Sequence, residues 1–173
     1  MPISDMGYKL LVRQILTNSQ LTSEDRQVVK DIVYGLDLTG EDSLTDVNDK
    51  WIIQQRLEAS IIYLLCKYEK AVGRSEAILE GIMSGLEEVE SVARLDMPKD
   101  YSNVESRKAY VRLDPDVAVH KGRVLEAKQA ILEAKELYSD IDRLAKTVFR
   151  RDKKIENMNV NVRRQMVADE NAE

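Results

Sequence analysis

Apolar residues recur at intervals of three and four positions along most of this chain, which is the period of an amphipathic α-helix. Between Asp46 and about Leu95 they form one stripe, interrupted only at Gly73, and Met97 and Pro98 then end the pattern. The stripe consists of Trp51, Leu57, Ile61, Leu64, Leu65, Tyr68, Val72, Ile78, Ile82, Leu86, Val89 and Val92. We therefore expect one long helix here, with the aromatic side chains of Trp51, Tyr63 and Tyr68 packed in the core.

A second long helix is predicted to begin at Asp114, Pro115 and Asp116, because Asp caps a helix and Pro suits its first turn. Heptads continue from there to about residue 167 with only Gly122 as a weak point. We expect contacts between chains at Val124, Ile131, Tyr138, Ile141, Val148 and Ile155. Leu125, Leu132, Leu137, Leu144 and Phe149 widen the stripe, so one face can pack on its own chain and another on neighbouring chains. The pattern predicts a mainly α-helical, oligomeric protein built on a long helical hairpin with a coiled-coil-like C-terminal helix.

The segment that connects these helices has a different pattern. From Lys108 to Leu113 polar and apolar residues alternate, which favours a short β-strand with Lys108, Tyr110 and Arg112 on one face. A helical turn is the competing interpretation, because six alternating residues also arise by chance.

The N-terminal part looks like a separate arm. Thr22 to Asp25 predict a helix start, and that helix should end near Leu36. Residues 39–45 have the composition of a linker. We therefore expect a helical arm over residues 1–45, a core for oligomerisation and binding over residues 46–167, and a disordered acidic tail over residues 168–173.

Composition narrows the class of protein. One third of the residues are charged and 5% are aromatic, and no segment resembles a signal peptide or a membrane span, so we expect a cytoplasmic protein. The single cysteine, Cys66, lies in an apolar run and is expected to be a buried thiol. The single histidine, His120, is expected on the helix seam. Because the chain lacks metal-ligand spacing, nucleophile motifs and phosphate-binding glycine motifs, we expect no enzymatic activity, metal or cofactor.

The net charge of −5 conceals an uneven distribution. Residues 107–164 carry 15 basic and 9 acidic side chains, whereas the segments before them are acidic. Arg94, Arg107, Lys108 and Arg112 supply charge that suits phosphates, and Tyr110 would add an aromatic platform for a base. These residues predict a site for single-stranded DNA, which a symmetric oligomer would repeat in every subunit. The basic run from Arg150 to Lys154 is more typical of a solvated helix face.

Four short segments resemble, in the same order, the UvsY recombination mediators of tailed bacteriophages. They are Leu57–Ser60 followed by Lys67 and Tyr68, Ala93–Asp96, Ser106–Ala109, and Asp114–Val117, within residues 46–166. The resemblance implies a ring-shaped homo-oligomer in an infected bacterial host. Such a protein binds single-stranded DNA, remodels the single-strand-binding protein and loads a RecA-like recombinase without catalysis.

In that family a basic pair in a K-x-R-L context is associated with DNA binding. Arg94 matches the arginine, but Val92 stands where the family has lysine. Lys99, with Arg107, Lys108 and Arg112, would supply the missing charge.

Two other functions fit the same sequence. A coiled-coil structural or assembly protein of a phage, such as a scaffold or tail chaperone, would use the heptads to hold chains together and the charges for solubility. A protein adaptor would instead bind its partner through residues 1–38.

Overall fold

The structure of the protein, a computed structural model, describes residues 5–40, 45–101 and 103–170. These residues form five helices, α1 (Asp5–Thr17), α2 (Ser23–Leu38), α3 (Val47–Leu95), α4 (Val104–Leu113) and α5 (Pro115–Glu170), and no strand. The prediction of a mainly α-helical protein is confirmed. None of the helices in the described ranges has the length and apolar character needed to cross a membrane.

Most helix boundaries follow the predicted signals. The Thr22 side chain caps α2, α3 continues through Gly73 and ends at Leu95, and α5 begins at Pro115. The Asp114 carboxylate accepts the backbone N–H groups of Asp116 and Val117 at 2.9 and 3.1 Å, which satisfies donors in the first turn of α5. Residues 168–170, predicted as part of a disordered tail, belong to α5, whereas residues 171–173 and 41–44 lie outside the described residues.

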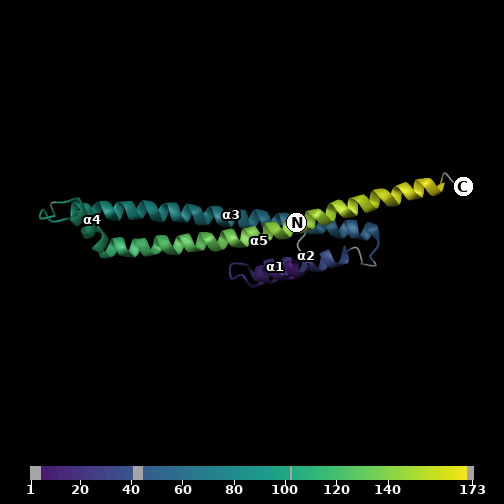
Figure 1. Cartoon of the computed structure of the whole chain (residues 1–173), viewed down its shortest axis with the longest axis horizontal. Helices are drawn as coiled ribbons and strands as arrows, with labels where there is room; N and C mark the ends of the chain where they lie inside the picture. The colour runs from purple at the N-terminus through teal and green to yellow at the C-terminus, as the bar shows by residue number, and fades with distance from the viewer. Residues whose placement is uncertain (1–4, 41–44, 102, 171–173) are drawn as a thin grey trace. The chain divides into compact units, whose positions relative to one another are not determined.

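The chain divides into two compact units. Residues 1–69 and 136–173 form the arm-bearing unit, and residues 70–135 form the turn unit. Within each unit the segments of α3 and α5 lie side by side and run in opposite directions (Figure 1). The arm-bearing unit therefore unites α1 and α2 with the ends of the hairpin, whereas the sequence predicted a boundary at residue 45.

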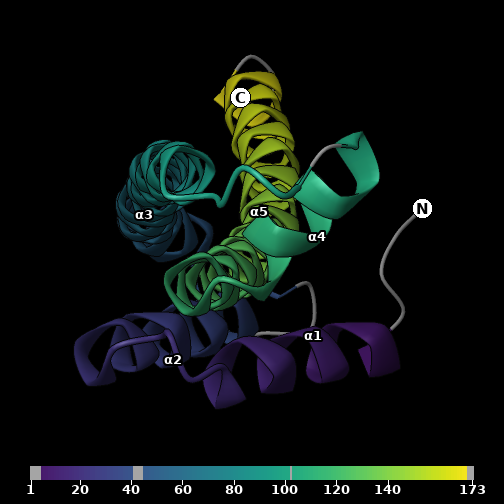
Figure 2. The ribbon, with the colours of Figure 1, turned by 90° about the vertical axis from the view of Figure 1, so that its left-hand side faces the viewer.

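The core of the arm-bearing unit is formed by side chains from all four of its helical segments. Its fully buried members include Ile15, Val29, Ile32, Ile61, Leu64, Leu137, Ile141, Leu144 and Val148. Gly35 permits the close approach of α2 to α3, because a Cβ there would lie 2.5 Å from a methyl group of Leu57. Figure 2 shows α1 and α2 side by side in this unit.

The heptad positions of α5 pack within the chain. Val124, Ile131, Ile141, Val148 and Ile155 are buried in the isolated protomer, and Tyr138 is half-buried. This corrects the prediction that they face other chains, because α3 supplies the partner surface that an adjacent chain was expected to supply. Of the five leucine and phenylalanine residues that widen the stripe, Leu125, Leu132 and Phe149 remain exposed.

Three further predictions about burial are wrong. Trp51, Tyr63 and Cys66 are exposed, whereas Tyr68 is buried as expected. The apolar residues of α3 extend around more of the helix than its neighbours cover, so neighbouring apolar positions differ in burial. The prediction for His120 agrees with its place in the turn unit, where its ring faces Gly85.

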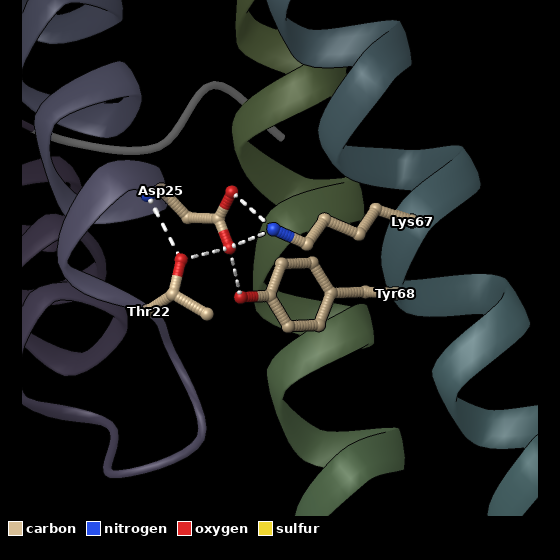
Figure 3. Close-up of polar contacts among 4 residues, drawn as sticks. All are labelled: Thr22, Asp25, Lys67 and Tyr68. Carbon is tan, nitrogen blue, oxygen red and sulfur yellow. Dashed lines mark hydrogen bonds and ion pairs between the residues drawn. The ribbon is translucent and has the colours of Figure 1, made fainter.

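A buried carboxylate joins α2 to α3 (Figure 3). Asp25, only 1% exposed, accepts hydrogen bonds from the Lys67 ammonium at 2.7 and 2.8 Å, from the Tyr68 hydroxyl at 2.8 Å and from the Thr22 hydroxyl at 2.6 Å. Burial alone would raise the pKa of Asp25, but these hydrogen bonds outweigh burial and hold that pKa below its ordinary value. The same carboxylate raises the pKa of Lys67. A fully satisfied network of this kind specifies how α2 lies on α3.

Replacing Asp25 by alanine is expected to lower the free energy of unfolding by about 2–3 kcal/mol, because the Lys67 ammonium and the Tyr68 hydroxyl lose their acceptor. The Lys67 side chain is 34% exposed, so water restores part of its solvation and the loss stays below that of a fully buried pair. Urea denaturation followed by circular dichroism measures the change. Asp31→Ala, at an exposed acid of the same helix, is the matched control and should change stability by less than about 0.5 kcal/mol. Equal losses in the two variants would contradict the role of Asp25.

The stabilisation by Asp25 should also depend on pH. Because the pKa of Asp25 is lowered in the folded protein, its contribution is present above the unfolded value of about 3.9 and is lost as the pH falls through the folded pKa. Because the pKa of Lys67 is raised, its contribution is present below about 10.4 and is lost as the pH rises through the folded pKa. The stability difference between the wild type and Asp25→Ala should therefore form a plateau between these limits. A difference that is constant from about pH 2 to pH 7 would contradict this assignment.

Candidate nucleic-acid interface

The ends of three helices meet in the turn unit. α3 ends at Leu95, and Pro98 follows in the connecting turn, where it cannot continue the helix. The Asn103 side chain caps α4 by accepting the backbone N–H of Ser106 at 2.7 Å, and Asp114 separates α4 from α5. As a result α4 connects the end of α3 to the start of α5 (Figures 1 and 2).

A small apolar cluster fixes α4 against both long helices. Ala93 of α3, Val111 of α4 and Val117 of α5 are buried against one another, and Leu86 and Val89 of α3 pack around them. Burial of these side chains holds the ten residues of α4, a helix too short to be stable alone in water. The cluster thereby sets which face of α4 is turned toward α3 and α5.

Beside this cluster lies an open pocket with a volume of about 630 Å³. Its lining comprises Glu90, Arg94 and Met97 from α3 and the turn after it, Val104, Arg107, Lys108, Val111 and Arg112 from α4, and Lys121 from α5. The lining thus combines five cationic side chains and one carboxylate with three apolar side chains, Met97, Val104 and Val111, which we call the apolar floor. A recess with this excess of positive charge attracts anions.

The helical period of α4 explains why these residues share one face. Val104, Arg107, Lys108, Val111 and Arg112 follow one another at spacings of three, one, three and one, which places them along one side of an α-helix. The predicted strand is therefore wrong, and the alternative of a helical turn is the correct one. Asn103, which caps α4, is a local signal that could have identified this helix from the sequence.

The strand prediction placed Tyr110 on the same face as the cations, but in the structure Tyr110 does not lie there. Its ring packs edge-on against Tyr101, with the ring centroids 5.0 Å apart and the planes at 61°. In an α-helix residue 110 lies about 200° from residue 108, whereas in a strand the two share a face. Tyr110 therefore does not provide the predicted aromatic platform, and the apolar surface of the pocket is its floor.

The cations of the pocket differ in their partners. The Glu90 carboxylate pairs with the Arg94 guanidinium at 3.2 Å and with the Lys121 ammonium at 3.4 Å. Arg107 donates from Nε to the backbone carbonyl of Tyr101 at 3.0 Å. Neither Lys108 nor Arg112 forms an ion pair with any carboxylate among the described residues, and both are exposed.

Of the residues predicted for DNA binding, Arg94, Arg107, Lys108 and Arg112 line the pocket. Lys99 lies exposed in the turn after α3 and does not line it, nor does Tyr110. Sequence reasoning missed Glu90 and Lys121. An antiparallel hairpin brings such positions together when both lie near the reversal of the chain. Their proximity can therefore be predicted only once the position of the reversal is known.

The other basic run and the other recesses are weaker candidates for a nucleic-acid interface. Arg150, Lys153 and Lys154 are exposed on α5 in the arm-bearing unit, as expected for a solvated face. Trp51 lines a smaller recess of about 250 Å³ with Glu156, Asn159 and Val160. Within the described ranges, no group of three or more histidine, cysteine or acidic side chains is placed to hold a metal ion.

Comparisons with protein-family models, with curated proteins and with solved structures return no match to this chain.

The apolar cluster makes a direct prediction about α4. In Val111→Asp a carboxylate would have to enter the contact with Ala93 and Val117, so we expect α4 to detach and its amide exchange to accelerate at least about tenfold. Hydrogen exchange followed by mass spectrometry on peptides spanning residues 104–113 measures this. Leu113→Asp is the matched control, because the same chemical change falls on an 82% exposed position of the same helix. Unchanged exchange in Val111→Asp would show that the cluster does not hold α4.

Proposed function

We propose that this protein is a non-enzymatic recombination mediator that binds single-stranded DNA in the pocket of the turn unit. The proposal rests on one observation, the grouping of five cationic side chains from three helices around an apolar floor. In this role the protein acts as a homo-oligomer and helps to load a RecA-like recombinase onto DNA held by a single-strand-binding protein, as the resemblance to the UvsY mediators implies.

The charge distribution supports a polyanionic ligand. The chain as a whole carries a net charge of −5, whereas its pocket is cationic, so the pocket can attract an extended polyanion although the chain as a whole is acidic. Contacts between cations and phosphates release counterions, which makes binding sensitive to salt. Arg107 and Lys108 are adjacent on α4 and Arg112 stands about one turn further along, so the three can contact neighbouring phosphates of one strand.

The floor of the pocket supports a single strand over a duplex. Met97 and Val104 offer an apolar surface within reach of the cationic rim, and an unpaired base can lie on that surface while its phosphate contacts a cation. In a duplex the bases are stacked and paired, so they reach such a floor only at the cost of unstacking.

Self-association would make binding tighter, because it would repeat the pocket in every subunit. One pocket per chain presents few phosphate contacts, and a closed oligomer would present one pocket in every subunit to the same strand. Exposed apolar side chains, including Leu125 and Leu132 of α5, are suited to contacts between chains.

The same exposed side chains favour a second candidate function, that of a phage structural or assembly protein that does not bind nucleic acid. Ile62, Tyr63 and Phe149 add further exposed apolar surface in the arm-bearing unit. The two candidates differ in whether the cationic pocket has a ligand. Light scattering that reports a stable oligomer, together with no binding of DNA, would favour the assembly protein.

Fluorescence anisotropy with a labelled oligothymidylate across a salt series tests the proposed ligand. We expect Arg107→Ala/Lys108→Ala/Arg112→Ala to weaken binding at least about tenfold and to make the slope of log K against log salt less negative by about 2, since each lost phosphate contact removes about 0.7. The matched control is Arg74→Ala/Arg123→Ala/Lys128→Ala, which removes the same charge from exposed cations of the turn unit outside the pocket. Equal losses in both variants, or no binding by the wild type at about 50 mM salt, would contradict the proposal.

The role of the floor can be tested with a strand that lacks bases. An abasic oligonucleotide of the same length keeps the phosphates, so we expect it to bind about fivefold more weakly, which corresponds to about 1 kcal/mol of apolar contact. In Val104→Ser the difference between the two strands should shrink, and because Val104 is 66% exposed the fold should be unaffected. Identical affinities of the wild type for both strands would show that only phosphates are recognised.

A further inference from the structure

The pocket of the turn unit contains its own anion. Glu90 is the single carboxylate in the lining, and its two oxygen atoms have different partners. Oε2 lies 3.2 Å from the Arg94 guanidinium one turn further along α3, and Oε1 lies 3.4 Å from the Lys121 ammonium on α5. One carboxylate thus occupies two cations from two helices.

The position of the Glu90 carboxylate between two cations matches the position that a phosphate would take between them. A phosphodiester has two non-bridging oxygens that carry its charge, and Arg and Lys bind them as they bind the two oxygens of a carboxylate. The remaining cations, Arg107, Lys108 and Arg112, have no carboxylate partner in the described part of the chain. The pocket is therefore divided into three cations ready for a ligand and two already held by Glu90.

The two ion pairs are exposed enough to exchange partners. The side chain of Arg94 is 61% exposed, that of Lys121 is 42% exposed and that of Glu90 is 24% exposed. Water and salt ions screen pairs at such exposure, so each pair is weak. An incoming phosphate can replace the carboxylate without leaving a buried charge unpaired.

We propose that Glu90 is an internal counter-anion, which holds Arg94 and Lys121 until a backbone phosphate of the bound strand displaces it. This inference rests on the proposed function. Glu90 then limits the affinity of the pocket: a short anion meets three cations, whereas a strand with several phosphates recruits the other two by displacing the carboxylate. The exchange keeps binding reversible, as a protein that hands its strand to another protein requires.

The opposite role makes the opposite prediction. If Glu90 serves to orient Arg94 and Lys121 toward the ligand, then its removal disorders two phosphate-binding groups and weakens binding. Glu90→Gln separates the two roles, because it removes the charge and keeps the size of the side chain. The position is at the surface of a helix, so the variant should fold, and circular dichroism with thermal unfolding checks that it does.

The experiment compares the wild-type protein and Glu90→Gln in the anisotropy assay with labelled oligothymidylate over a salt series. We expect Glu90→Gln to bind about threefold to tenfold more tightly at low salt, and its slope of log K against log salt to be more negative by up to about 1.4, as two cations become available to phosphates. Glu88→Gln is the matched control: it makes the same change in net charge at an exposed position of α3 outside the pocket, and its affinity should stay within about twofold of the wild type.

A second comparison tests whether the gain in affinity arises through Arg94 and Lys121. In an Arg94→Gln/Lys121→Gln background the gain from Glu90→Gln should disappear, because the cations that it releases are absent. If the wild type binds DNA and Glu90→Gln shows no gain or a loss of affinity, the role of Glu90 is overturned while the proposed function stands. An equal gain in Glu88→Gln would have the same consequence. No binding by either the wild type or Glu90→Gln would overturn both.

Discussion

The reversal of the chain between α3 and α5 is held in one geometry by the contact of Val117 with Ala93 and Val111. Two long helices that run side by side can be joined in many ways, and a short helix between them has no stability of its own. By burying one side of α4, this contact decides that Arg107, Lys108 and Arg112 face the same recess as Arg94 and Lys121. The electrostatic character of the turn unit therefore depends on three apolar side chains.

A different kind of contact organises the arm-bearing unit. Asp25 is a buried carboxylate whose cost of burial is offset by hydrogen bonds from Thr22, Lys67 and Tyr68. Apolar packing between amphipathic helices tolerates small changes in register, whereas these hydrogen bonds form at one register only. Asp25 first serves the local start of α2, where Thr22 caps the helix, and its carboxylate then serves the contact between α2 and α3.

The pocket shows how the packing of helices gathers charges that lie apart in the sequence. On the two long helices acidic residues are interspersed among the basic ones, and the chain as a whole is acidic. Where α3, α4 and α5 meet, five basic side chains converge and one acidic side chain lies among them. Because Glu90 pairs with cations of two helices, the convergence is stabilised in the absence of a ligand, and the same carboxylate competes with the phosphates that we propose as the ligand.

The sequence by itself determined the helices, because their signals are local. Period, capping residues and proline act within a few positions, so Thr22, Pro98 and Asp114 marked boundaries that the structure reproduces. Four of the six residues predicted for the site also line the pocket, and three of these, Arg107, Lys108 and Arg112, do so because they are close together on one helix. Only the tertiary structure decided which apolar residues of a wide stripe are buried. It placed the heptad positions of α5 against α3 of the same chain and left Trp51, Tyr63 and Cys66 exposed. It also decided the conformation of Lys108 to Leu113, because a six-residue alternation fits a strand and a helix equally well until Val111 finds its partners. Glu90 and Lys121 could be assigned to the pocket only after the hairpin was known, because their proximity is a property of the reversal and of no segment on either side.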